Sequence, residues 1–149
     1  MKRTSMNDSI CPIARTLDLI GDWWTLLIVR DALGGIKRFS EFQRHLGAAK
    51  NILSSRLKTL VAEGILEIAP ASDGSAYQEY LLTQKGKDLY PILIALGQWG
   101  HAYMFDENEA CSYSVERQTG QPLAQMRVRA QDGRELAAED IEIIPGDQH

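Results

Sequence analysis

The amino-acid sequence predicts a mainly α-helical fold with a small β-hairpin, of the α+β class, and three observations lead to this prediction. Apolar residues recur every three or four positions through most of residues 12–105, which is the spacing of helices with one buried face. An Asp-Gly pair at residues 73–74 separates two short runs rich in β-forming residues, which favours a hairpin. Beyond residue 105, polar and apolar residues alternate as they do in strands. We therefore expect a main domain over residues 1–105 and a small acidic, β-rich extension over residues 106–149.

The first two helices are delimited by residues with clear conformational preferences. Pro12 is a favourable first helical residue and predicts a helix that runs to about Ile20. Asp22 can accept hydrogen bonds from the free N–H groups of a helix start, so it is the expected N-cap of a helix over residues 23–33. Gly34 then ends that helix.

Two further short helices are expected on either side of a tight turn. Ser40 is the expected cap of the first, which ends at Gly47. The second covers residues 51–63 and ends before Gly64. Its apolar residues share one face at helical spacing, and they are Leu53, Leu57, Leu60 and Val61.

The periodicity changes after this pair of helices. Residues 65–69 and 77–82 are the two strands expected on either side of the Asp-Gly turn. Thr83 is the expected cap of a long final helix that reaches about Phe105, and its apolar stripe contains Leu93, Leu96, Trp99 and Tyr103. Pro91 lies within this helix, where it should bend the axis or loosen one turn.

Local charge around the two short helices opposes the charge of the whole chain. The formal net charge of the protein is −4. Residues 37–62, in contrast, contain six basic residues and one acidic residue, Glu41. A basic helix that carries small polar side chains and follows a turn is suited to the major groove of DNA.

The order of elements and the motifs within them resemble those of HxlR-type transcriptional regulators, which are related to MarR-like winged-helix proteins. The resemblance covers about residues 10–105 and rests on an ordered set of motifs: Cys11-Pro12, Gly21-Asp22-Trp23, Leu27 to Asp31, Arg38 to Phe42, Asn51 to Leu57, Gly64-Ile65-Leu66, Glu79 to Thr83, Gly86 and Trp99-Gly100. It implies a winged helix-turn-helix that acts as a DNA-binding transcriptional repressor, as a homodimer on a pseudo-palindromic operator. An oxidant, an electrophile or another small-molecule effector is a candidate signal.

Candidate DNA contacts divide by their chemistry. Asn51, Ser54 and Ser55 carry short hydrogen-bonding groups suited to base edges. Phosphate contacts are expected from Lys37, Arg38, Lys50, Lys58 and the backbone N–H of Ser40. Arg56 is a further DNA candidate, with pairing to Glu63 or to another acidic neighbour as the alternative. The hairpin has no Lys or Arg between residues 66 and 82 and contains Glu67, Asp73 and Glu79, so we expect it to add little DNA affinity.

The homodimer implied by the resemblance is held by the N-terminal helix and the long final helix. The residues expected at this interface are Leu17, Leu93, Leu96, Trp99 and Tyr103. The alternative is that the same stripe closes the core of the monomer. A two-fold contact is favoured, because a symmetric helix-turn-helix protein needs a dimer to span two half-sites about 34 Å apart.

Cys11 is the most distinctive chemical group outside the basic segment. It precedes Pro12 at a helix start, where the helix dipole and free N–H groups stabilise a thiolate. Several HxlR-type regulators carry a sensing cysteine at this place, whereas free cysteines in general are often small buried hydrophobes; both interpretations stay open. If the N-terminal arm meets the partner's final helix, Cys11 of one subunit approaches Cys111 of the other.

Other classes of protein find little support in the sequence. It contains no nucleophile elbow, no phosphate-binding Gly-rich loop and no spaced set of metal ligands, so we expect no enzyme, cofactor or metal site. No apolar run is long enough to span a membrane and no signal-peptide core is present, so a cytoplasmic location is expected. The competing function is a winged-helix protein-interaction module that does not bind DNA.

Overall fold

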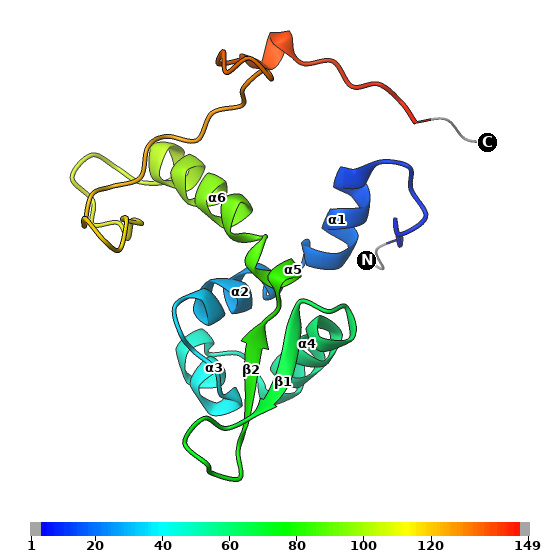
Figure 1. The fold of residues 1–149 in the computed structure, drawn as a ribbon, viewed down its shortest axis with the longest axis vertical. Coiled ribbons are helices and arrows are strands. Elements are labelled where there is room, and N and C mark those ends of the chain that lie inside the picture. Colours follow the sequence, from blue (N-terminus) through cyan, green and yellow to red (C-terminus); the bar gives the residue numbers. More distant parts are fainter. Residues whose placement is uncertain (1–3, 147–149) are drawn as a thin grey trace. The chain divides into compact units, whose positions relative to one another are not determined.

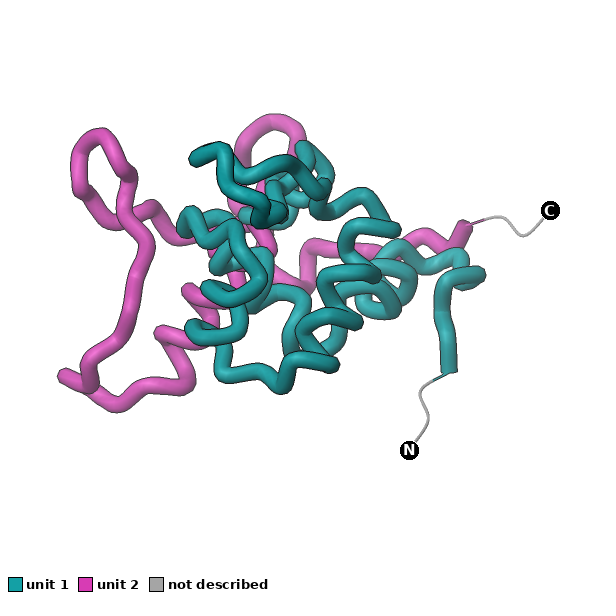
Figure 2. The backbone as a smooth tube through the Cα atoms, turned by 90° about the horizontal axis from the view of Figure 1, so that it is seen from below, with its two compact units in different colours: residues 1–90, 148 teal, residues 91–147, 149 magenta. Residues whose placement is uncertain are grey.

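The computed structural model describes residues 4–146, which form helices and one β-hairpin (Figure 1). The elements are α1 (Pro12–Ile20), α2 (Thr25–Leu33), α3 (Phe39–Leu46), α4 (Lys50–Ala62), β1 (Leu66–Pro70), β2 (Gln78–Leu82), α5 (Gln84–Lys87), α6 (Tyr90–Tyr103) and the short 3-10 helix η1 (Ala138–Asp140). The chain divides into two compact units, one ending at Tyr90 and one beginning at Pro91 (Figure 2). The division falls before the boundary at residue 105 expected from the sequence, because α6 groups with the C-terminal segment.

The core of the first unit lies where α2, α3 and α4 meet the hairpin. Contacts join α4 to β1, α2 to β2, and α2 to α3, and Figure 1 shows α4 alongside β1. The largest fully buried apolar side chains come from all of these elements: Phe42, Ile28, Leu53, Leu57, Leu60, Ile65, Leu66 and Val29. Each such side chain contributes about 1.5–3 kcal/mol when it leaves water. These residues make a winged helix-turn-helix, as predicted.

The hairpin is antiparallel, and one acidic side chain stabilises its loop. The register pairs Leu66 with Leu82 and Pro70 with Gln78. Glu79 is buried, and its carboxylate accepts hydrogen bonds from the backbone N–H of Ser72 at 2.9 Å and from the Ser72 hydroxyl at 3.2 Å. Glu79 therefore holds the loop that leads out of β1.

The single helix expected from Thr83 to Phe105 is wrong, because the structure has two helices there. Thr83 does cap α5, since its Oγ1 accepts a hydrogen bond from the N–H of Gly86 at 3.1 Å. The chain then leaves the helical path before α6 begins at Tyr90. Pro91 lies in the first turn of α6, where its missing N–H costs nothing, whereas in a continuous helix it would break a backbone hydrogen bond.

The regular strands expected beyond residue 105 are absent from residues 106–146. Two isolated bridges, Val115 to Pro122 and Arg129 to Glu135, are the β-pairing in this segment. The chain turns at Gly120 and at Gly133, which have positive φ angles of 72° and 94°. Apolar side chains of the segment are exposed, and a short ribbon without a covered apolar face does not sustain a regular ladder.

Replacing Gly86 by Ala should destabilise the first unit. A Cβ at this position would overlap the carbonyl oxygen of Ile65 and lie 2.8 Å from a methyl group of Leu82. We expect the free energy of unfolding to fall by about 1–3 kcal/mol, as for other overpacked sites. Urea unfolding followed by circular dichroism measures this change. Gly100→Ala is the matched control, because a Cβ there meets nothing within 4 Å; equal stability of the two variants would contradict the prediction.

Candidate nucleic-acid interface

The exposed face of α4 presents the small polar and basic residues predicted to meet DNA. Leu53, Leu57 and Leu60 bury the opposite face of the helix. Their burial fixes which residues point outward, and these are Lys50, Asn51, Ser54, Ser55 and Lys58, all of them exposed. No side chain of this group forms a hydrogen bond or an ion pair within residues 4–146, so the group is available to a partner.

The helix α3 begins two residues earlier than a Ser40 cap would place it, at Phe39 with Arg38 as the N-cap residue. Ser40 is the second residue of the helix and not its cap. The carboxylate of Glu41 instead accepts the backbone N–H of Arg38 at 3.2 Å, which closes the helix start. Ser40 is exposed, as is Lys37 just before the helix. The backbone N–H of Ser40 still lies in the first turn, where N–H groups lack helical acceptors and can bind an anion.

Arg56 is paired with an acidic residue far away in the sequence, and its side chain is 41% exposed. Its Nε lies 3.4 Å from a carboxylate oxygen of Asp22. The same oxygen accepts the N–H groups of Trp24 and Thr25, each at 3.0 Å. Asp22 therefore binds the N–H groups at the start of α2, but the helix begins at Thr25 with Trp24 in the N-cap position, two residues later than predicted. The acidic neighbour considered for Arg56 is Asp22, and this ion pair fixes α4 against the start of α2.

Arg38 contacts the hairpin, whose strands and loop we call the wing. Its guanidinium lies 2.5 Å from the carboxylate of Asp73 and over the ring of Tyr77, with 5.3 Å to the ring centroid. Hydrogen bonds from the backbone and side chain of Ser75, followed by the Arg38 contact, hold the pKa of Asp73 well below its usual range. The hydrogen bond to Asp73 raises the pKa of Arg38. With Asp73 paired and Glu79 buried, the wing is less repulsive to phosphate than its sequence suggests.

Sequence reasoning missed a contact that the buried carboxylate of Asp31 makes between α2 and α3. The side chain of Asp31 is 2% exposed, and its carboxylate lies 2.8 Å from Nδ1 of His45 and 2.9 Å from the guanidinium of Arg30. Asp31 follows Ile28 by three residues, so helical spacing places it on the buried side of α2. That spacing is the signal that could have identified this contact.

The two cysteines have different surroundings. Cys11 is exposed and directly precedes α1, so its interpretation as a buried hydrophobe is wrong. Cys111 is half-buried, and its Sγ lies 3.2 Å from Nδ1 of His101 and 3.3 Å from the carbonyl oxygen of Ser112. The His101 contact was not anticipated from the sequence.

The residues predicted for the dimer interface are mostly uncovered. Leu17 of α1 is 55% exposed, while on α6 Leu96, Trp99 and Tyr103 are 52%, 60% and 73% exposed. The rings of Trp99 and Tyr103 pack together with centroids 5.2 Å apart. Leu93 is half-buried against the C-terminal segment. Because α6 contributes no buried residue, the stripe does not close the core of the monomer.

Neither membrane nor metal features stand out in the described part of the chain. No helix within residues 4–146 has the length and apolarity to cross a membrane. No group of three or more potential metal ligands gathers in the same residues.

Comparisons with known proteins agree with this architecture. Residues 19–108 match the family model described as HxlR-like helix-turn-helix. The HTH-type transcriptional regulator Rv3095 of Mycobacterium tuberculosis is 42% identical over 92 residues, covering 62% of this chain and 58% of the relative, so the chain matches little more than half of that protein. The crystal structure of PA1607, described as a candidate transcription factor, is 52% identical with a TM-score of 0.89 and covers 95% of this chain and 99% of its own. The redox regulator HypR in its reduced form is 32% identical with a TM-score of 0.58, covering 63% of this chain and 94% of its own.

The contact between the wing and Arg38 should persist into acid solution. An Asp whose pKa is lowered by folding stabilises the fold above its ordinary value of 3.8 and loses that contribution only as the pH falls through the lower folded value. In an NMR titration, the Ser75 amide signal should therefore stay constant from pH 7 to about pH 4. Asp73→Asn is the control that removes the charge. A transition of the wild-type signal centred near the ordinary value would contradict the prediction.

Proposed function

Because this chain belongs to the HxlR-like helix-turn-helix family, we propose that it is a transcriptional regulator that binds double-stranded DNA with the exposed face of α4. The observation that carries the proposal is the group of exposed, unpaired polar and basic side chains on a helix whose other face is buried. Such a helix can enter the major groove without disturbing the core that positions it.

The proposed contacts follow from how each side chain is held. Asn51, Ser54 and Ser55 read base edges, since they are short and outward. Phosphates are bound by Lys37, Lys50, Lys58 and the backbone N–H of Ser40. Arg38 and Arg56 have carboxylate partners, so we assign them mainly to positioning the wing and α4.

We further propose that the protein acts as a homodimeric repressor on a pseudo-palindromic operator. The exposed apolar side chains of α1 and α6 are the surface that a second copy would cover. A two-fold dimer places two copies of α4 about one turn of DNA apart, roughly 34 Å.

A redox response is the proposed form of regulation. Cys11 is exposed and directly precedes α1, so an oxidant can reach it, and HypR, a relative in structure, is a redox regulator. Peroxide would oxidise the thiols of Cys11 and the partner subunit's Cys111 to one disulfide and would itself be reduced to two molecules of water.

The DNA proposal is tested with genomic fragments selected by the wild-type protein. Binding of a selected fragment should weaken steeply with salt, because each neutralised phosphate contributes about 0.9 to the slope of log K against log salt concentration. Lys58→Ala should lower this slope by about 0.9 for each subunit. Arg134→Ala is the matched control outside the helix-turn-helix and should leave the slope unchanged, since Asp132 already pairs with that charge.

Two results would count against DNA binding. The first is the absence of binding to any selected fragment at low salt, which would favour a protein-interaction module. The second is an equal slope for the wild type and Lys58→Ala, which would remove α4 from the interface.

The redox proposal predicts a disulfide-linked dimer after mild peroxide treatment. On a non-reducing gel the wild type should give a dimer band that dithiothreitol removes. Cys11→Ser and Cys111→Ser should each abolish the band, because the disulfide needs both thiols. A wild-type chain that stays monomeric on the gel after oxidation, or a band that persists in Cys11→Ser, would overturn the proposed pair.

A further inference from the structure

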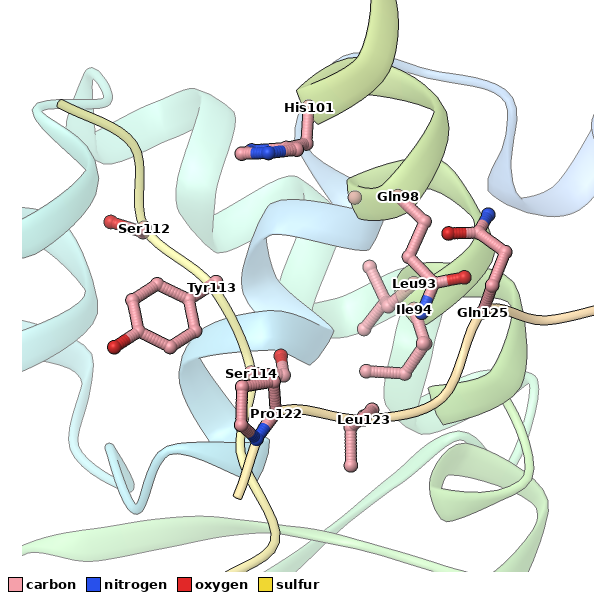
Figure 3. A pocket seen from close by; sticks show the side chains of 11 residues that line it. Leu93, Ile94, Gln98, His101, Ser112, Tyr113, Ser114, Pro122, Leu123 and Gln125 are labelled. Carbon is pink, nitrogen blue, oxygen red and sulfur yellow. The ribbon is translucent and has the colours of Figure 1, made fainter. Parts of the chain in front are cut away.

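A cavity of about 320 Å³ lies within the second compact unit, between α6 and the chain that follows it (Figure 3). Leu93, Ile94, Gln98 and His101 line it from α6, residues 112–114 lie opposite, and residues 122–125 close one side. This volume is at the lower end of the range found for small-molecule sites. It is large enough for a ligand of one or two rings.

Two polar contacts hold the walls of the cavity together at separate points. The carboxamide of Gln98 donates to the carbonyl oxygen of Ala124 at 3.0 Å and accepts the N–H of Met126 at 2.7 Å. At another point, Nδ1 of His101 lies 3.2 Å from Sγ of Cys111. Regular strands are absent from residues 106–146, so these side-chain contacts, and not a β-sheet, hold the chain against α6. The cavity is therefore defined by specific hydrogen bonds and not by loose chain alone.

The lining combines an apolar surface with unused hydrogen-bonding groups. Leu93, Ile94, Pro122 and Leu123 supply the apolar part. The hydroxyl groups of Ser112, Tyr113 and Ser114 form no hydrogen bond within residues 4–146. No Asp, Glu, Lys or Arg is among the described residues that line the cavity. A charged ligand would therefore find no opposite charge in this lining, whereas an uncharged, mainly apolar ligand needs none.

Gly97 leaves part of the cavity open. It lies in the middle of α6, where glycine costs roughly 1 kcal/mol of helix stability relative to alanine. A Cβ at this position would meet nothing within 4 Å, so the packing of the chain on itself does not require glycine. The space beside Gly97 is free for another molecule.

We infer that this cavity binds one uncharged, mainly apolar small molecule that carries a hydrogen-bonding group. The apolar part of the ligand lies against Leu93, Ile94 and Leu123, and its polar group meets the hydroxyl of Ser114, which faces the cavity in Figure 3. The inference goes beyond DNA binding. Occupancy of the cavity needs neither DNA nor an oxidised thiol, so it can be measured on the protein alone.

The test uses 1-naphthylamine, an uncharged fluorescent probe with two fused apolar rings and an N–H donor group. The full chain should bind about one probe per chain with saturable fluorescence. Gly97→Leu extends a side chain into the cavity and should weaken binding about tenfold or more, which corresponds to at least about 1.4 kcal/mol. Gly97→Ala should weaken it less and keeps the fold, because alanine is the better helix former.

Gly100→Leu is the matched control. Gly100 lies on the same helix with nothing within 4 Å of its Cβ position, but it does not line the cavity, so probe binding should stay within about twofold of the wild type. Sedimentation measures the mass of each variant, and circular dichroism measures its helix content.

Three outcomes would overturn the inference. One is a wild-type chain that shows no saturable binding of the probe. Another is equal weakening by Gly97→Leu and Gly100→Leu. The third is a Gly97→Leu chain of lower mass, which would mean that a second copy of the protein covers the cavity. None of these measurements contains DNA, so failure of this inference leaves the DNA-binding proposal to be decided by its own salt dependence.

Discussion

Burial of one face of α4 is the constraint on which the rest of the molecule depends. Leu53, Leu57 and Leu60 are each at most 1% exposed, and they fix the rotation of the helix about its axis. When the apolar face of a helix is fixed, the directions in which its other side chains point are fixed as well. The polar and basic side chains of the proposed DNA contact are therefore oriented by packing that lies entirely on the opposite side.

Acidic residues around this helix hold the geometry without blocking the surface. Asp22 pairs with Arg56, Asp31 with His45, and Asp73 with Arg38. Each pair joins segments that are distant in the sequence. None of them uses Lys50 or Lys58, the basic residues on the exposed face of α4. Consequently the chain keeps a net charge of −4 while Lys50 and Lys58 stay available for phosphate.

The two compact units have separate chemical roles. The unit that ends at Tyr90 contains the helix-turn-helix and the wing. The unit that begins at Pro91 contains the uncovered stripe of α6, the contact between His101 and Cys111, and the cavity beside Gly97. Ligand binding, part of the dimer surface and part of the redox chemistry are thus proposed for the unit that begins at Pro91, whereas the proposed DNA contacts lie in the other unit. A signal received there can be altered by mutation without changing the base-reading residues.

The sequence by itself determined the features that depend on neighbouring residues. Pro12 marked the start of α1 correctly, the Asp-Gly pair marked the hairpin, and the spacing of the leucines in α4 identified its buried face. Each of these follows from local conformational preference or from a period of three to four residues. Only the tertiary structure decided the partners of Arg38 and Arg56, the burial of Asp31, and the absence of regular strands from residues 106–146. These features share one physical reason, which is that each depends on distant parts of the chain. An ion pair such as Arg38 with Asp73 joins residues 35 positions apart, and a strand persists only when another part of the fold covers it. Neither can therefore be read from a short stretch of sequence.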